Sequence, residues 1–294
     1  MLDFKNVEKS QIQNYKKYYD YTEAIGCEYN FVGAYLWNKE YKLKIAFYDD
    51  TLIKVYFMDD DTIWGYCMPS GKNVGGAIEA IFQDAAERGQ QAAFGYMSKR
   101  ERDELENLYP DKFVFERSTT TQDYIYLSED LASLAGKKFH AKRNHISKFY
   151  RTYENTHFEE ITLSNFADAL KVAQLWCDEN DLDFSEYGEY AVIKEAVENL
   201  DELNMKGLLL YVDGKPIAMT LGTEISKLCF DVMFEKALKE YDGSYSVICN
   251  EFAKRLTEYK YINREEDLGI EGLKKSKLSY HPVIVYDRFD GVPK

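Results

Sequence analysis

A basic segment is the most unusual feature of the sequence. Residues 136–153 read GKKFHAKRNHISKFYRTY and contain no acidic residue, although the whole chain carries a net charge of −14. Within this segment Arg143 can bind a phosphate or carboxylate through two parallel hydrogen bonds, and Asn144 can add a directed one. We therefore expect an anion-binding site here. Its candidate residues are His140, Lys142, Arg143 and Asn144.

The same segment has the spacing of an amphipathic helix from about Lys137 to Arg151. Ile146, Phe149, Tyr150 and Tyr153 recur at helical intervals, so one face can pack while the basic side chains project elsewhere. A solvated basic face on an ordinary surface helix is the simpler interpretation of this pattern.

A second polar segment, NREEDLGIEGLKKSKLSYHP, covers residues 263–282. Its first residues follow a predicted strand, and α/β proteins commonly place their clefts at the carboxyl ends of strands. His281 precedes Pro282, which favours an extended backbone for the histidine. Ordinary helix physics offers an alternative, in which Asp267 caps a helix and Glu271 pairs with a lysine. The anion-binding candidates are Asn263, Arg264, Asp267, Lys274 and Tyr280, and the catalytic candidates are Glu265 and His281.

Two further carboxylates lie on or just after a predicted strand at 227–234. Strand alternation puts Asp231, Met233 and Glu235 on one face, where a carboxylate could accept a proton during a transfer reaction. The same spacing also suits two solvent-facing side chains, so Asp231 and Glu235 are catalytic candidates with a structural alternative.

A short polar loop, Tyr241–Ser246, precedes a predicted helix. Backbone N–H groups at a helix start can bind phosphate, such as that of coenzyme A or of a tRNA 3′ end. The cofactor-binding candidates are Gly243, Ser244 and Tyr245.

The elements that must position these residues follow a clear order from residue 157. The turn Asp213-Gly214 is a strong hairpin signal between two apolar runs, and Ser164 is placed to cap the first helix. The expected elements are a strand at 157–163, a helix at 164–180, a helix at 190–200, a hairpin at 207–225, a strand at 227–234, a helix at 246–259, a strand at 259–263, a helix at 269–280 and a strand at 283–289.

The first half repeats much of this order. We expect a helix at 8–20, three strands within 41–68, a helix at 75–89 with Gly89 at its C-terminal end, and a strand at 92–97. Ser98 and Glu101 have the spacing of a capping box for a helix that ends at Pro110. Residues 113–131 are expected to close this half as a strand pair.

The whole chain is therefore predicted to be α/β (α+β), with a mixed sheet flanked by helices in each half. With 294 residues, two domains are expected. The predicted division is an N-terminal module at 1–130, a basic linking helix at 131–156 and a C-terminal module at 157–294.

Composition excludes several classes of protein. The longest apolar runs, such as 31–37 and 207–212, have the length of a strand and cannot span a bilayer. The N-terminus has no export signal, so we expect a cytoplasmic protein without membrane insertion. The five cysteines are odd in number and lack metal-ligand spacing, which predicts reduced thiols and no metal site. The acidic charge argues against DNA binding, so any anion site must be local.

The two polar segments, together with residues 123–149 and 235–256, resemble a bacterial family related to the C-terminal, aminoacyl-transferring domain of phosphatidylglycerol lysyltransferases. The resemblance covers most of the chain and implies two tandem GNAT-like modules, similar to the Fem-type peptidoglycan aminoacyltransferases. In the lysyltransferases this domain is joined to a multi-helix membrane region. The sequence also lacks the R/Q-x-x-G-x-G/A loop of coenzyme-A-dependent GNAT members, with Glu240–Tyr245 in its place.

The resemblance implies an acyl- or aminoacyl-transferase that acts on an amine or hydroxyl acceptor, with aminoacyl-tRNA or an acyl thioester such as acyl-CoA as the donor. A tRNA partner fits this function. Two alternatives belong to other classes. The first is a non-catalytic protein that binds RNA, a nucleotide or another anion on the same fold, and the second is a scaffold that has kept only the fold. In the enzymatic interpretation Arg143 and Asn144 should point towards Arg264 and His281.

Overall fold

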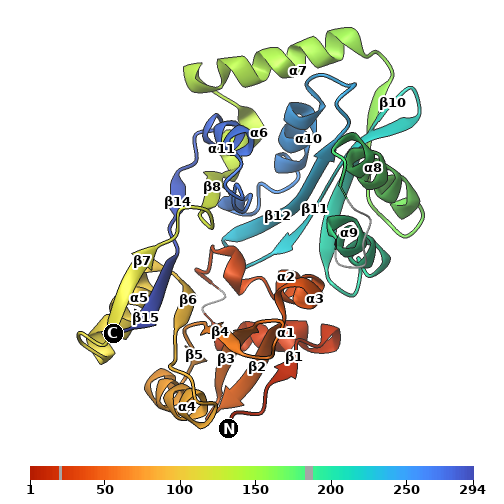
Figure 1. The fold of residues 1–294 in the computed structure, drawn as a ribbon. Helices are drawn as coiled ribbons and strands as arrows, with labels where there is room; N and C mark the ends of the chain where they lie inside the picture. The colour runs from red at the N-terminus through yellow and green to blue at the C-terminus, as the bar shows by residue number, and fades with distance from the viewer. Residues whose placement is uncertain (20–21, 183–187) are drawn as a thin grey trace. The chain divides into compact units, whose positions relative to one another are not determined.

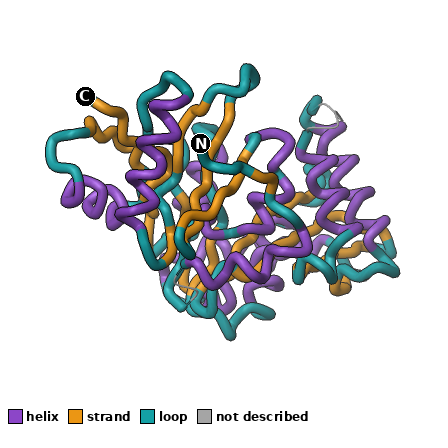
Figure 2. Tube along the Cα trace, turned by 90° about the horizontal axis from the view of Figure 1, so that it is seen from below, coloured by secondary structure: helices purple, strands orange, loops and turns teal. Residues whose placement is uncertain are grey.

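The computed structural model describes residues 1–19, 22–182 and 188–294, and the chain forms two compact units. The first unit comprises residues 1–123, 266–274 and 285–294, and the second comprises 124–265 and 275–284. These units differ from the continuous division at 130 and 156, because the C-terminal residues return to the first unit. The helices and strands of each unit can be followed in Figures 1 and 2.

The first unit contains a mixed sheet in which β4 and β6 are parallel and the other described pairs are antiparallel. Its strand order is β1 (Lys5–Asn6), β2 (Leu43–Tyr48), β3 (Thr51–Phe57), β4 (Ile63–Tyr66), β6 (Phe94–Met97), β15 (Phe289–Pro293) and β7 (Phe113–Arg117), with β5 (Ser70–Gly71) beside β3. Its helices are α1 (Ile12–Tyr15), α2 (Phe31–Leu36), α3 (Asn38–Tyr41), α4 (Val74–Glu87) and α5 (Lys99–Leu108).

Local signals explain most of these elements. The apolar face of α4 buries Ile78 and Ile81 against strand residues such as Val55 and Phe94. The capping box predicted at Ser98 and Glu101 is confirmed in both directions at the start of α5. The helix predicted at 8–20 is shorter in the structure. It consists of α1 with one 3-10 turn before it and another after it, which ends at Tyr18, and Asp20 lies outside the described residues. The run 31–37 forms α2, with the Asn30 side chain as its N-cap.

The second unit contains the longer strands. Its order is β14 (Ile284–Tyr286), β8 (Asp123–Leu127), β13 (Tyr261–Asn263), β12 (Cys229–Ala237), β11 (Lys215–Glu224), β10 (Met205–Val212) and β9 (Thr156–Glu160), with β12 and β13 parallel. Figure 1 shows α8 (Phe166–Glu179) and α9 (Glu189–Glu198) on one side of this sheet and α10 (Ser244–Ala253) on the other. The remaining helices are α6 (Ser128–Ser133), α7 (His140–Thr152) and α11 (Glu271–Leu278). The first residues of α11 belong to the first unit.

The hairpin predicted at Asp213-Gly214 is confirmed, with both residues at positive φ between β10 and β11. Other boundaries needed correction. Ser164 does not cap α8, which starts one residue after Asn165 without a side-chain cap. The helix predicted to reach 259 ends at Ala253, and Leu256 and Tyr259 are buried in the turns that follow.

Two predicted strand segments each divide between the sheets. The pair expected at 113–131 is wrong, because β7 pairs with β15 in the first sheet while β8 pairs with β13 in the second. The strand expected at 283–289 likewise separates into β14 and β15. The mixed α/β class, with a mixed sheet and flanking helices in each unit, is confirmed.

Candidate active site

A bulge in β12 determines which way Glu235 points. In the register with β11, Val232 faces Gly222 and Phe234 faces Leu221, so Met233 is an extra residue on β12. Val232 and Glu235 consequently line the same small pocket beside α10. Asp231 lies between Phe230 and Val232, which both pack in the core on the α10 side, so its side chain points to the opposite face. The prediction that Asp231 and Glu235 share a face is therefore wrong.

A tight turn after β13 presents Arg264 to this pocket. Asn263 is buried, and its Oδ1 accepts a hydrogen bond from the N–H of Glu265 at 2.7 Å. The buried ammonium of Lys277 donates to the backbone carbonyls of Arg264 and Glu265, and the Tyr126 hydroxyl donates to the Lys277 carbonyl at 2.8 Å. These contacts fix the backbone on both sides of Arg264.

The Arg264 guanidinium forms an ion pair with Glu235, with Nη2 2.7 Å from Oε1. Both side chains are almost buried, with 12% and 11% of their surfaces exposed. The other terminal nitrogen, Nη1, is buried and has no hydrogen-bond partner among the described residues. Because a buried donor without a partner is costly, the arrangement suits a ligand that brings an acceptor oxygen into the pocket.

Lys142 and Arg264 both lie against the ring of Tyr280. The Lys142 Nζ is 3.7 Å from the ring centroid, and the Arg264 guanidinium carbon is 4.9 Å from it. Burial and, second to it, the positive charge of Arg264 lower the pKa of Lys142 to about 8. A lysine with such a pKa is partly neutral near pH 8 and can accept a proton.

Two residues that sequence reasoning missed complete this cluster. Cys249 lines the pocket with Arg264 and Glu235, and burial raises the pKa of its thiol to about 12, which keeps it neutral. The Tyr280 hydroxyl lies 3.4 Å from the Ser246 Oγ. Ser246 and Cys249 are three residues apart on α10 and therefore lie on one face of the helix, and this spacing was visible in the sequence.

The structure therefore brings together four predicted residues from distant parts of the sequence: Lys142, Glu235, Arg264 and Tyr280. The expectation that Arg143 and Asn144 face Arg264 and His281 is not met. The Arg143 Nη1 donates to the backbone carbonyls of Leu134 and Gly136, where it stabilises the turn before α7. Lys142, one residue earlier on the helix, is the side chain that reaches Arg264's surroundings.

Asn144 and its neighbour His140 lie on the exposed side of α7, with Asn144 Nδ2 3.4 Å from His140 Nδ1. The helix is an integral part of the second unit, because Phe139 and Phe149 are fully buried in its core. The predicted packing face is thus present in the structure.

His281 does not have the extended backbone expected before a proline. Its φ is +54°, because the chain reverses after α11 and the His281 N–H donates to the Leu278 carbonyl at 3.0 Å. The ring packs against Phe139, and Nε2 lies 3.1 Å from the Lys138 carbonyl. Glu265 also has a positive φ, of 52°, and its backbone carbonyl accepts a hydrogen bond from the Lys277 ammonium.

Two predicted residues belong to the first unit. Asp267 is buried, and its Oδ1 accepts a hydrogen bond from the Gly269 N–H at 2.8 Å in the turn before α11. Lys274 lies in the first turn of that helix, with its N–H bonded to the Ile270 carbonyl. Their predicted role in anion binding stays a prediction.

The loop before α10 packs against α7. Gly243 has a φ of +92°, and a Cβ there would lie 3.0 Å from the His145 carbonyl oxygen. The Ser244 and Ser246 N–H groups donate to carbonyls of the loop itself, and the Tyr245 hydroxyl accepts a hydrogen bond from Trp176 at 2.8 Å. Cofactor binding by Gly243, Ser244 and Tyr245 stays a prediction, whereas their packing role is visible.

Both units are thus mixed α/β units, each with helices that flank its sheet. A protein-family model described as "Phosphatidylglycerol lysyltransferase, C-terminal" matches residues 19–290. The chain belongs to this family.

Similar solved structures agree with this assignment of fold. A conserved protein of unknown function from Bacteroides thetaiotaomicron is 34% identical, with a TM-score of 0.93 and full coverage of both chains. The C-terminal domain of a putative lysylphosphatidylglycerol synthetase from Agrobacterium fabrum is 14% identical, with a TM-score of 0.69 over 98% of this chain and 92% of that one. FemX is 7% identical, with a TM-score of 0.60 over 98% and 97% of the two chains.

A curated relative, the uncharacterised protein MYCGA3080 of Mycoplasmoides gallisepticum, is 22% identical over 192 residues. The match covers 63% of this chain and 59% of that protein, so the chain spans little more than half the length of its relative. Within the described residues, no helix is both long and apolar enough to cross a membrane.

Proposed function

We propose that the chain is an acyl- or aminoacyl-transferase whose transfer site is the cluster around Arg264 in the second unit. Its donor is an activated ester or thioester, as in aminoacyl-tRNA or acyl-CoA, and its acceptor is an amine or a hydroxyl group. The observation that carries this proposal is the buried Nη1 of Arg264, a hydrogen-bond donor without an acceptor among the described residues.

The proposed reaction uses Arg264 to stabilise charge. When the acceptor nitrogen or oxygen attacks the acyl carbon, a new C–N or C–O bond forms and the carbonyl oxygen becomes an oxyanion. A fixed donor in a site of low dielectric stabilises this charge more than water does. Glu235 holds the guanidinium in place through Nη2, which leaves Nη1 for the oxyanion.

Lys142 is the proposed proton acceptor. In its neutral form it takes the proton that the acceptor loses on attack, and it returns that proton to the leaving ribose oxygen or thiolate as the old C–O or C–S bond breaks. Its pKa near 8 suits this exchange, because a catalytic base works best when its pKa is close to the working pH.

An aminoacyl-tRNA donor is supported by the basic surface of the segment around α7. Lys137, Lys138, Lys148 and Arg151 are exposed there. Lysine and arginine side chains in such positions can neutralise phosphates of an RNA backbone, and binding of this type weakens as salt increases.

The test is a transfer assay with the full chain. The donors are bulk tRNA charged with a labelled amino-acid mixture and labelled acetyl-CoA, and the acceptors are ethanolamine, lysine amide and phosphatidylglycerol vesicles. We expect transfer from at least one donor, and a loss of roughly 10²- to 10³-fold in kcat/KM for Arg264→Gln, as for removal of an oxyanion donor in other enzymes.

The matched control is Arg255→Gln, which changes an arginine of the same unit that donates to Glu251 near the end of α10 and lies over the Phe158 ring. This variant should keep the wild-type rate. Equal rates for the two variants would exclude Arg264 from the transfer step. Salt-sensitive tRNA binding without turnover for every donor would instead favour the non-catalytic anion-binding protein.

A further inference from the structure

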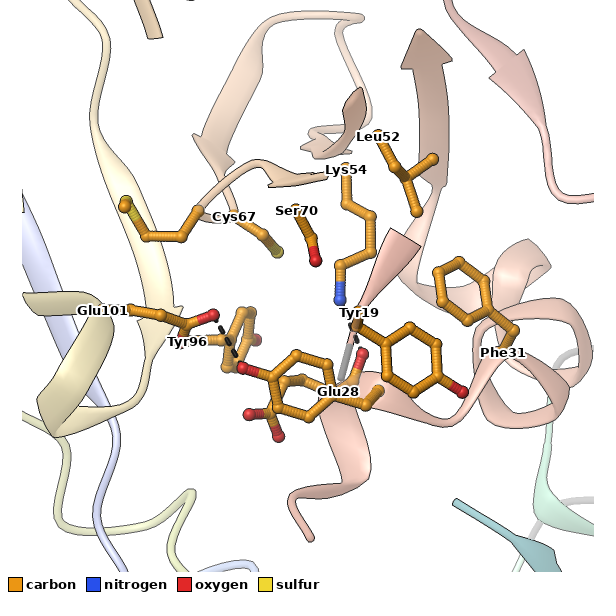
Figure 3. A pocket seen from close by; sticks show the side chains of 11 residues that line it. Tyr19, Glu28, Phe31, Leu52, Lys54, Cys67, Ser70, Tyr96 and Glu101 are labelled. Atoms are coloured by element: carbon orange, nitrogen blue, oxygen red, sulfur yellow. Dashed lines mark hydrogen bonds between the residues drawn. The ribbon is translucent and has the colours of Figure 1, made fainter. Parts of the chain in front are cut away.

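An ammonium group lies against aromatic rings in each unit of the molecule. In the first unit, Figure 3 shows the Lys54 side chain in a small pocket, and its Nζ lies 5.7 Å from the ring centroids of Tyr29 and Phe31. This ammonium also donates a hydrogen bond to the Glu28 backbone carbonyl at 2.6 Å. A hydrogen bond to the backbone therefore holds Lys54 in place.

Lys142 of the second unit is held differently. Within the described residues its Nζ takes part in no hydrogen bond and no ion pair, and it lies 3.7 Å from the centroid of the Tyr280 ring. The ionisable groups that act on it are Arg264, Cys249 and Glu235. A lysine stem is long and flexible, so the contact with the ring is what keeps the ammonium in the site.

The Arg264 guanidinium makes this position unfavourable for a second cation. Its central carbon lies 4.9 Å from the centroid of the same Tyr280 ring, and the nearby carboxylate of Glu235 is already paired with it. Burial and repulsion both favour an ammonium that turns out to solvent. The negative face of an aromatic ring attracts an ammonium, and more strongly where water is excluded. The ring face of Tyr280 thus supplies the attraction that keeps Lys142 beside Arg264.

The Tyr280 ring is itself fixed by its surroundings. The residue is 3% exposed, and its N–H donates to the Lys277 carbonyl at 3.1 Å just after α11. The Tyr126 ring meets it edge to face, with centroids 6.4 Å apart and planes at 84°. The Tyr280 hydroxyl donates to the Ser246 Oγ at 3.4 Å. A ring held at three points can serve as a fixed platform for a mobile side chain.

The hydroxyl of Tyr280 is poorly suited to proton transfer. Burial, as the largest cause, raises the pKa of Tyr280 above the ordinary range of a tyrosine, so the hydroxyl keeps its proton near neutral pH. That proton is directed to Ser246, and not to Lys142 or Arg264. The contribution of Tyr280 to the site therefore comes from its ring.

We propose that Tyr280 is a positioning residue of the transfer site, and that its ring face, not its hydroxyl, holds the Lys142 ammonium beside Arg264. The consequence for transfer rests on the proposed function. The position of Lys142 can be measured without turnover.

The first experiment follows Lys142 by NMR in the full chain with side-chain-labelled lysine, and Lys142→Met assigns its signal. In the wild-type chain the Lys142 Cε protons should be shifted upfield, because protons over an aromatic face are shielded. The titration midpoint should lie near pH 8. In Tyr280→Leu the ammonium should turn to solvent, so the upfield shift should disappear and the midpoint should rise towards the ordinary value of 10.5.

Tyr280→Phe keeps the ring and lacks the hydroxyl, so the upfield shift should remain and the Lys142 midpoint should stay near pH 8. Tyr150→Leu is the matched control, because it changes a tyrosine of α7 that is 42% exposed, and it should leave the Lys142 signal unchanged.

Three results would overturn the proposal. They are a wild-type spectrum without the upfield shift, a Lys142 midpoint that stays near pH 8 in Tyr280→Leu, and equal changes in Tyr280→Phe and Tyr280→Leu, which would assign the role to the hydroxyl. If Tyr280→Leu does not fold, the wild-type upfield shift and the titration of Tyr280→Phe decide the question.

The second experiment measures transfer. Tyr280→Leu should lower kcat/KM about 10²-fold, as Lys142→Met does, because the proton acceptor is no longer in place. The double variant should lose no more than Lys142→Met alone, and losses that add up would contradict a role through Lys142. If Lys142→Met transfers at the wild-type rate, the proposed proton acceptor is wrong, whereas the NMR result still decides whether Tyr280 holds Lys142.

Discussion

Each unit of the molecule contains a buried arginine, and the two arginines stand in opposite electrostatic surroundings. In the first unit Arg288 pairs with two carboxylates, Glu28 and Asp123. In the second unit Arg264 pairs with a single carboxylate, Glu235, and has Lys142 as a neighbouring cation. The charge surplus is therefore negative around Arg288 and positive around Arg264.

The pKa of one ionisable group is shifted in each of these surroundings. The pKa of Glu28 is raised to about 7, and that of Lys142 is lowered to about 8. In both cases burial is the largest cause. The charge of Arg264 adds to the shift of Lys142, whereas for Glu28 the charge of Arg288 opposes the shift and that of Asp123 adds to it.

Removal of Arg288 should have the largest effect on stability. Arg288→Met leaves two carboxylates buried without their cation, and breaking a buried pair in this way costs about 3–5 kcal/mol of unfolding free energy. Urea unfolding at pH 8 measures it. Arg117→Met is the control in the same unit, because the pair that Arg117 forms with Asp287 is largely exposed and should contribute about 0–1 kcal/mol. Equal losses of unfolding free energy for the two variants would show that the buried Arg288 pairs contribute no more to stability than the exposed Arg117 pair.

The pH dependence of transfer should reveal Lys142. A proton acceptor works only when neutral, so kcat/KM should rise as pH increases through about 8, where Lys142 loses its proton. Lys142→Met should remove this limb and lower the rate about 10²-fold or more, in the range of general-base catalysis. Lys171→Met changes an exposed lysine on α8 of the same unit and should keep the rise in kcat/KM near pH 8. A limb at pH 8 that survives in Lys142→Met would assign the base to another group.

A smaller effect is expected where a helix of each unit begins. Gly243→Ala should destabilise the second unit by about 1–2 kcal/mol, because its φ is +92° and its Cβ would press on the His145 carbonyl. In the first unit, a Cβ at Gly75 in α4 meets nothing within 4 Å, so Gly75→Ala should be neutral or stabilise by about 0.5–1 kcal/mol. Thermal unfolding of both variants measures the contrast, and a loss at Gly75 that matches the loss at Gly243 would contradict it.

Local signals in the sequence were sufficient for much of the fold. The capping box at Ser98 and the Asp213-Gly214 turn each depend on residues close together in the chain, and both are present in the structure. The division of 113–131 and 283–289 between two sheets could not be predicted in this way. Which strand pairs with which depends on contacts more than a hundred residues apart, and periodicity carries no such information.

The candidate site was predictable only in part. Arg264, Tyr280 and Glu235 were found because polar residues at strand ends are informative, but the bulge at Met233 reversed the face assumed for Glu235. Arg143 was preferred over Lys142 on chemistry alone, although one helical step of 100° separates their directions. Arg288 was missed because it lies in a run, 283–289, that was predicted as a single strand, whereas the structure places it between β14 and β15; its partners Glu28 and Asp123 lie 260 and 165 residues away.

The most direct test of the two buried groups is a site-resolved NMR titration of the folded chain. Carboxyl-labelled glutamate and side-chain-labelled lysine report the two groups, and spectra of Glu28→Gln and Lys142→Met assign their signals. We predict midpoints near pH 7 for Glu28 and near pH 8 for Lys142. Midpoints near the ordinary values of 4.5 and 10.5 would contradict the account.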